Sequence, residues 1–97
     1  MHARMTTIRT QPGKLAEAMD IARGSIAPHA KGQRGFKSLL ALVDREDDEI
    51  VFVSLWETEE DMEAGERSGY YREQIGKFGG MLAGEVVREA YEVSIQA

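Results

Sequence analysis

The feature that most constrains the fold is a pair of apolar runs near the middle of the chain. Residues 36–44 read FKSLLALVD, residues 50–56 read IVFVSLW, and the charged segment REDDE separates them. Two runs of this kind joined by a short polar connection predict an antiparallel hairpin. Because side chains alternate across a strand, runs that stay apolar at successive positions indicate that both faces of the sheet are covered.

The segment before the hairpin predicts a strand followed by a helix. Residues 3–10 are rich in β-branched side chains and stop at the turn signal QPG, as a strand would. The next apolar residues recur at helical spacing and form one face: Leu15, Met19, Ala22 and Ile26. We expect Pro28 to end or kink this helix, because proline has no N–H and disfavours helical geometry in the residue before it.

A second helical region and a last strand follow the hairpin. Thr58 and Asp61 match a capping box at a helix start, and Ser68–Gly69 interrupt the helical pattern. The next segment places four apolar residues on one helical face: Tyr71, Ile75, Phe78 and Leu82. Residues 85–95 predict the final strand. The order β-α-β-β-α-β is that of an α+β, ferredoxin-like fold with an antiparallel sheet.

The apolar hairpin also predicts a partner. Two helices cover only one face of such a sheet, so the apolar side chains of the other face need a second cover. Burial of one leucine-sized side chain is worth about 1.5 to 3 kcal/mol, and several are present. We therefore expect a homodimer whose sheets face one another. The alternative is that these residues belong to an unusually apolar core within one chain.

Composition narrows the classes of protein that remain. The 97 residues predict a single domain over 1–97, and the formal net charge of −5 without a basic block argues against a nucleic-acid binder. The chain has no cysteine, which excludes disulfides and thiolate chemistry. We find no membrane-length apolar run and no signal region, and so expect no membrane partner and a cytoplasmic location.

Three motifs give the chain a resemblance to a known family. RGFKSLLALVD on the second strand, VFVSLWET on the third and SGYYREQ in the second helix resemble the antibiotic biosynthesis monooxygenase family of dimeric α+β barrels, over residues 4–95. The family includes cofactor-independent oxygenases of polyketide quinols, quinol monooxygenases, haem-degrading enzymes and proteins of no assigned activity. The resemblance implies a dimeric α/β barrel with a pocket between the helices and the sheet of each subunit.

The haem-degrading branch is disfavoured by the residues themselves. Its asparagine, tryptophan and histidine positions align with Thr6, Gly65 and Ile75, and the chain contains no asparagine. In the polyketide oxygenase branch, a strand tryptophan corresponds to Trp56, whereas Phe52 stands where an asparagine is expected.

The resemblance and side-chain chemistry together indicate a set of site residues. We predict that four residues bind substrate: Trp56, Phe52, Tyr71 and Thr6. We predict that three act in catalysis: Arg72 as holder of an anion, Tyr70 as a free hydroxyl and His29 as a base. Each also has a plainer interpretation. Trp56 and Tyr71 would then be packing residues, Arg72 a surface ion-pair partner of Glu66 or Glu73, and His29 an exposed loop residue.

Two function hypotheses of different classes follow. The first is a small oxidoreductase in which an apolar pocket binds a flat phenol or quinol that is deprotonated and reacts with oxygen. This chemistry implies no metal and no organic cofactor, and the two histidines show no metal-ligand spacing. The second is a non-catalytic dimeric module that stores or senses a small apolar molecule. Haem binding without degradation is a third possibility.

Overall fold

The computed structural model describes residues 1–97 apart from the side chain of Tyr70. The chain begins with strand β1 (His2–Arg9) and a long helical region made of α1 (Leu15–Ile21), the π-helical segment η1 (Ala22–Ile26) and α2 (Ala27–Lys31). Strands β2 (Phe36–Asp44) and β3 (Glu49–Trp56) form the hairpin. Helices α3 (Glu59–Arg67) and α4 (Tyr70–Gly76), the 3-10 turn η2 (Gly79–Met81) and strand β4 (Val87–Glu92) complete the fold.

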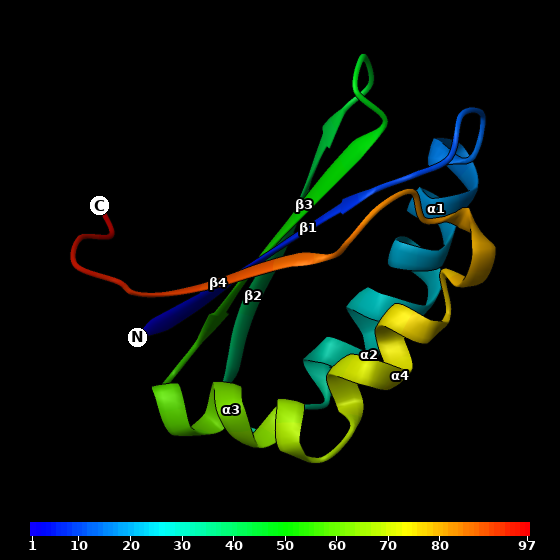
Figure 1. The fold of residues 1–97 in the computed structure, drawn as a ribbon. Helices are drawn as coiled ribbons and strands as arrows, with labels where there is room; N and C mark the ends of the chain where they lie inside the picture. The colour runs from blue at the N-terminus through cyan, green and yellow to red at the C-terminus, as the bar shows by residue number, and fades with distance from the viewer.

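The four strands form one antiparallel sheet in the order β2-β3-β1-β4. The helices lie on one side of this sheet, and the two termini lie at the same end of it (Figure 1). The predicted β-α-β-β-α-β order and the ferredoxin-like α+β fold are thereby confirmed. The chain is a single copy here, so the second half of the predicted barrel stays a prediction.

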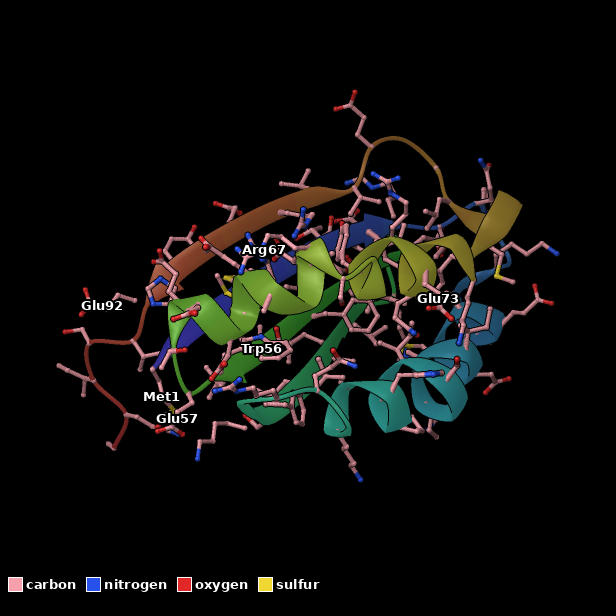
Figure 2. All side chains as sticks on the ribbon, turned by 90° about the horizontal axis from the view of Figure 1, so that it is seen from below. Met1, Trp56, Glu57, Arg67, Glu73 and Glu92 are labelled. Carbon is pink, nitrogen blue, oxygen red and sulfur yellow. The ribbon has the colours of Figure 1, made fainter. Side chains whose placement is uncertain are left out.

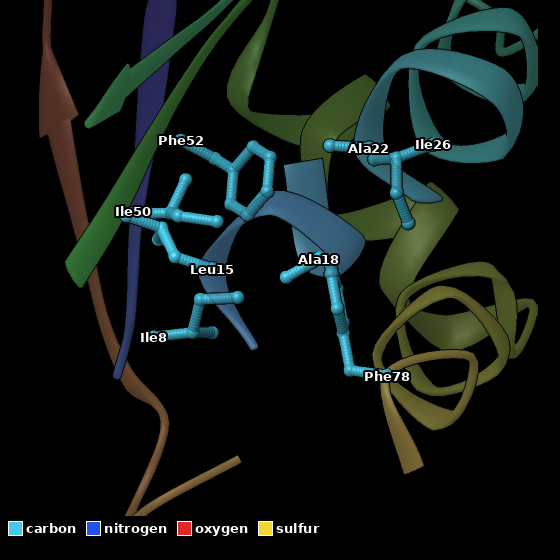
Figure 3. Packing of buried hydrophobic residues seen from close by; sticks show 8 residues of the cluster. All are labelled: Ile8, Leu15, Ala18, Ala22, Ile26, Ile50, Phe52 and Phe78. Atoms are coloured by element: carbon cyan, nitrogen blue, oxygen red, sulfur yellow. The ribbon is translucent and has the colours of Figure 1, made fainter. Parts of the chain in front are cut away.

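The core fills the space between the sheet and the first helical region. Ile8, Ile50 and Phe52 project from β1 and β3 toward the helices (Figure 3). They meet Phe78 from beyond α4 and the predicted apolar face of the long helix, on which Leu15, Ala22 and Ile26 are buried and Met19 is partly buried; Ala18, which was not predicted, is also buried there. The helical spacing of the sequence therefore identifies the correct face.

Pro28 does not end the first helix. The helical path continues to Lys31 because a π-helical turn precedes the proline, in which the N–H of Ala27 donates to the carbonyl of Ala22. Proline has no N–H to donate to the preceding turn, and its ring clashes with a carbonyl of that turn. A wider, π-helical turn accommodates both the missing hydrogen bond and the ring. Of the two outcomes expected at Pro28, an end of the helix or a kink, the end is wrong, and the proline is accommodated by a local change of hydrogen-bond register.

The second helical region begins as predicted. Thr58 is the N-cap of α3, and its Oγ1 accepts the N–H of Asp61 at 3.0 Å. In a capping box the Asp61 side chain would reach back to the N–H of Thr58. Here the Asp61 carboxylate forms an ion pair with Arg34, at 3.6 Å from Nε. The break at Ser68–Gly69 is also confirmed, because Gly69 has a left-handed φ of 88° that starts the new direction of α4.

The outer face of the sheet carries apolar side chains that the chain itself leaves uncovered. Leu40, Leu42, Val87 and Tyr91 are 58%, 50%, 51% and 48% exposed. The register places Leu42 beside Val51, and Val87 on the same row across β1. These side chains do not belong to the core of one chain, so the single-core explanation of the apolar hairpin is wrong for the outward-facing positions.

Candidate functional site

A small cavity of about 80 Å³ lies between the sheet and the helices. Most of its wall is apolar and comes from every layer of the fold: Ile26, Leu39, Phe52, Trp56, Ile75 and Phe78. The wall also has polar residues from two strands and two helices: Arg4 and Thr6 of β1, Ser54 of β3, Glu66 of α3, and Tyr71 and Gln74 of α4. Such a combination, apolar with a few convergent polar groups, is typical of a small-molecule site.

Trp56 closes one side of the cavity at the end of β3. The side chain is buried, and its Nε1–H donates to Oγ of Ser54 at 2.9 Å. The ring of Phe36 meets it edge-on, with centroids 5.8 Å apart. Figure 2 shows Trp56 between the ribbons of α3 and the first helical region. The indole therefore contributes an aromatic surface to the cavity, while its one donor is already occupied by the protein.

A carboxylate and two guanidinium groups form a cluster at the cavity, in which Arg4 and Glu66 line the cavity and Arg88 lines the adjoining hollow. Arg88 on β4 contacts Glu66 on α3, with 2.6 Å between Nη2 and Oε1. Arg4 on β1 forms an ion pair with the same Oε1 atom. All three side chains are only partly exposed, so the ion pairs are less screened than surface pairs. This cluster carries one more positive charge than negative.

Tyr71 is packed against this cluster. The guanidinium carbon of Arg88 lies 3.7 Å from the centre of the Tyr71 ring, which is a cation–π contact. Burial raises the pKa of Tyr71, and Glu66 adds to that rise, whereas Arg88 and Arg4 lower the pKa. The phenol is therefore protonated at neutral pH and able to donate a hydrogen bond.

Gln74 is the most unusual residue of the wall. Only 4% of the side chain is exposed, and neither Nε2 nor Oε1 has a hydrogen-bond partner in the described part of the chain. It stands one turn after Tyr71 on the face of α4 that lines the cavity. A buried polar group left without a partner costs about 1 to 3 kcal/mol, so this amide has capacity for a partner inside the cavity.

A second, more open hollow of about 450 Å³ adjoins the cavity. The two share Glu66, Tyr71 and Ile75 as walls, so these residues form the boundary between them. Three arginines line the outer hollow: Arg67, Arg72 and Arg88. Together the two spaces fall within the range of about 300 to 1,000 Å³ that small-molecule sites occupy.

The structure brings all four predicted substrate-binding residues together. Thr6, Phe52, Trp56 and Tyr71 all line the cavity. Arg72 is exposed and lines the outer hollow.

Of the other two predicted catalytic residues, only His29 has a described side chain. His29 lies on an exposed position of α2, with Nδ1 at 3.3 Å from the carbonyl of Ser25, and is not brought to the cavity. The prediction for Tyr70 concerns a side chain outside the described residues.

Five polar residues of the site are absent from the predicted site residues: Arg4, Ser54, Glu66, Gln74 and Arg88. One signal was available for Gln74, because it is a polar residue beside Tyr71, Ile75 and Phe78 in the apolar stripe of a helix. The arginines and Glu66 come from three distant segments, and no spacing in the sequence connects them.

Within the part of the chain that the structure describes, no three histidine or acidic side chains gather closely enough to hold a metal ion. No helix in the same part has the length and apolar character needed to cross a bilayer.

Fold and cavity define the class: a ferredoxin-like α+β domain with a small, mostly apolar cavity between its sheet and its helices. The sequence matches the family model described as antibiotic biosynthesis monooxygenase over residues 1–76. The chain therefore belongs to the antibiotic biosynthesis monooxygenase family, as the sequence motifs predict. The match ends before β4, so Arg88 lies outside it.

Solved structures agree with this fold. A protein from Nitrosomonas europaea whose name assigns it to the same family superposes with a TM-score of 0.82 at 14% identity, covering 98% of this chain and 100% of the other. One from Bordetella bronchiseptica gives 0.82 at 19% identity, covering 97% of each chain. One from Deinococcus radiodurans gives 0.80 at 15% identity, covering 100% and 96%. Among proteins with curated descriptions, none matches this chain.

Proposed function

We propose that the protein is a cofactor-independent monooxygenase that acts on a small phenol or quinol. The observation that carries this proposal is the composition of the cavity wall. Aromatic rings from Phe52, Trp56 and Phe78 suit a flat substrate, and the Arg4–Glu66–Arg88 cluster with Tyr71 suits an oxygen that becomes an anion. Family membership supports the same class of reaction.

The residues of the charged cluster have different roles in the first step, which is deprotonation of the substrate. Both arginines contact Oε1 of Glu66, which leaves Oε2 as the atom that we assign to receive the proton of the substrate hydroxyl. Glu66 takes the place of His29 in this role, because Glu66 lines the cavity and His29 does not. The arginine charges and the Tyr71 hydroxyl then stabilise the phenolate, which is the electrostatic part of catalysis.

The oxygenation step balances without an added reductant. A phenol and one O₂ give a quinone and one water: one oxygen atom forms the new C=O, and the other leaves as water with the ring hydrogen and the hydroxyl hydrogen. The substrate supplies all the electrons. The apolar walls keep bulk water from the phenolate, which strengthens its attraction to the arginines.

Oxygen consumption tests this proposal. Purified protein is mixed with a panel of hydroquinones, phenols and anthrones in an oxygen electrode, and we expect uptake above buffer for at least one, with a quinone as product. Glu66→Gln should abolish the uptake, while Glu63→Gln on the outer side of the same helix should leave it unchanged. No uptake across the panel would contradict the proposal.

A non-catalytic binding module is the second candidate, and one observation favours it. The only carboxylate among the described cavity-lining residues is already paired with two arginines. If that pairing prevents proton transfer, the cavity still binds. Saturable protection in thermal melting by a phenol, without oxygen uptake or product, would identify the binding function.

We also propose that two copies associate through the outer face of the sheet. Leu40 and Leu42 of β2 are at least half exposed in the single chain, and Val87 of β4 extends the same face. Burial of each leucine is worth about 1.5 to 3 kcal/mol, which favours association over hydration. The cavity lies on the opposite, helical side of the sheet, so this association leaves the outer hollow open. A cytoplasmic location remains a prediction.

A further inference from the structure

The buried amide of Gln74 points to the chemistry of the ligand. Its side chain is 4% exposed, and both Nε2 and Oε1 lack a partner in the described part of the chain. The two atoms can be exchanged by turning the amide over, and the conclusion is the same because both are without a partner. A purely apolar ligand would leave this donor and this acceptor unpaired in a dry site.

The amide sets a specific requirement, because it presents a donor and an acceptor side by side in one plane. A carboxylate or a quinone offers acceptors only and leaves Oε1 without a donor. A lone hydroxyl has a single oxygen, which cannot align with both atoms at once. Two oxygens on adjacent ring carbons, at least one of them a hydroxyl, accept from Nε2 and donate to Oε1 together.

The surrounding wall fits an arene that carries such a pair. Phe52 and Phe78 lie 6.2 Å apart between ring centroids and line the cavity with Trp56. The inner cavity, about 80 Å³, is smaller than the roughly 150 Å³ cavity that holds benzene in another protein. A ring therefore extends beyond the inner cavity toward the outer hollow, whose boundary with the cavity includes Tyr71 and Ile75.

We propose that Gln74 selects neutral arenes with two adjacent oxygen substituents, as in catechol, over isomers whose oxygens are further apart. The proposal concerns the same cavity and rests on the proposed function only in taking a phenol as the ligand. Gln74 is a specificity-determining residue in this scheme and takes no part in proton transfer.

Trp56 provides a direct readout, because it is the only tryptophan of the chain and lines the cavity. Its fluorescence is titrated without oxygen against catechol, resorcinol, hydroquinone and phenol. We expect catechol to bind about tenfold or more tightly than each of the other three, which corresponds to one well-made buried hydrogen bond.

Variants test whether the Gln74 amide, and not the rest of the cavity wall, causes the preference for catechol. Gln74→Leu and the unbranched Gln74→Met should both reduce the preference to about threefold or less, and thermal melting verifies that at least one of them folds. Glu73→Ala, at an exposed position of the same helix, should retain the full preference. Equal binding of the isomers by the wild type, or a preference that persists in a folded Gln74 variant, would overturn the proposal.

The outcomes also distinguish this proposal from the oxygenase proposal. Catechol preference without oxygen uptake supports the role of Gln74 and contradicts the oxygenase. Oxygen uptake with equal binding of all isomers contradicts the role of Gln74 and leaves the oxygenase intact. If no phenol binds, the role of Gln74 is wrong. If Gln74→Leu is more stable and binds all isomers as the wild type does, the amide is a hydrated structural residue and the proposal is again wrong.

Discussion

The guanidinium carbon of Arg88 lies 3.7 Å from the centre of the Tyr71 ring. This contact joins the edge strand β4 to helix α4, across the boundary between the cavity and the outer hollow. The register pairs Arg88 with Thr6, so its side chain is on the helical face of the sheet, where it also reaches Glu66. Arg88 therefore contacts both the ring of Tyr71 and the carboxylate of Glu66 in the proposed site.

Replacing Arg88 should reduce stability more than replacing an exposed strand arginine. Arg88→Gln removes the cation–π contact and one of the two ion pairs of Glu66, and we expect a loss of about 1 to 2 kcal/mol in the free energy of unfolding. Arg9→Gln is the matched control, because Arg9 pairs with Glu49 at 3.4 Å in an exposed setting worth less than about 0.5 kcal/mol. Urea unfolding at one fixed protein concentration measures both, and equal losses would contradict the role given to Arg88.

The titration of Tyr71 should move in opposite directions in two variants. Arg88 lowers the pKa of Tyr71 and Glu66 raises it, although burial is the largest cause of its net rise. Arg88→Gln should therefore raise the pKa further, and Glu66→Gln should lower it. Phenolate absorbance reports the titration in a background in which the other two tyrosines are replaced, Tyr70→Phe and Tyr91→Phe, since a hydrogen bond to Glu89 also raises the pKa of Tyr91. Shifts of the same sign in the two variants would contradict the arrangement.

The same raised pKa makes stability depend on alkaline pH. Below about pH 10 the phenol is protonated in both the folded and the unfolded state, and it contributes no slope. Above that pH the unfolded chain ionises first, so the free energy of unfolding falls as pH rises toward the folded pKa of Tyr71. Tyr71→Phe should make this alkaline fall shallower, as measured by urea unfolding between pH 9 and 11. An unchanged slope would show that Tyr71 is not buried as described.

The fold was predictable because its determinants are local and repetitive. Apolar spacing identified the inner face of the first helical region, and the unbroken apolar runs identified the hairpin. For Pro28 the sequence predicts an end or a kink of the helix, and it does not reveal that a π-helical turn accommodates the proline so that the helix continues. The outcome at such a position depends on packing of the whole helix against the sheet, which a local pattern does not contain.

The lining of the cavity was more predictable than its charged cluster. Phe52 and Trp56 lie on strands whose direction the pattern specifies, and both line the cavity. The Arg4–Glu66–Arg88 cluster depends on the pairing of β1 with β4 and on where α3 crosses them, which are tertiary facts.

The proposed dimer predicts that a charge on the outer face produces monomers. Leu42 is 50% exposed in the single chain and stands beside Val51 on that face. Leu42→Lys should shift the wild-type mass to half its value in light scattering at micromolar concentration, because a dimer would have to bury the new charge. Glu46→Lys, in the exposed β2–β3 turn, should leave the mass unchanged. A monomeric wild type would contradict the dimer outright.

Two glycines should respond to alanine with opposite signs. Gly35 has a φ of +77°, and an added Cβ would lie 2.2 Å from Oδ2 and 2.6 Å from Cβ of Asp61. Its carbonyl also accepts the N–H of Glu57 at 2.7 Å, next to Trp56.

Gly35→Ala should therefore lower the free energy of unfolding by about 2 to 3 kcal/mol and alter the Trp56 emission. The strain of a left-handed backbone at alanine adds to the cost of displacing Asp61. At Gly24, within the first helical region, an added Cβ meets no described atom within 4 Å, and Gly24→Ala should stabilise by about 0.5 to 1 kcal/mol. Urea unfolding compares the two variants. A tolerated Gly35→Ala would mean that the turn into β2 can relax, and the packing of Asp61 against it would then not be fixed.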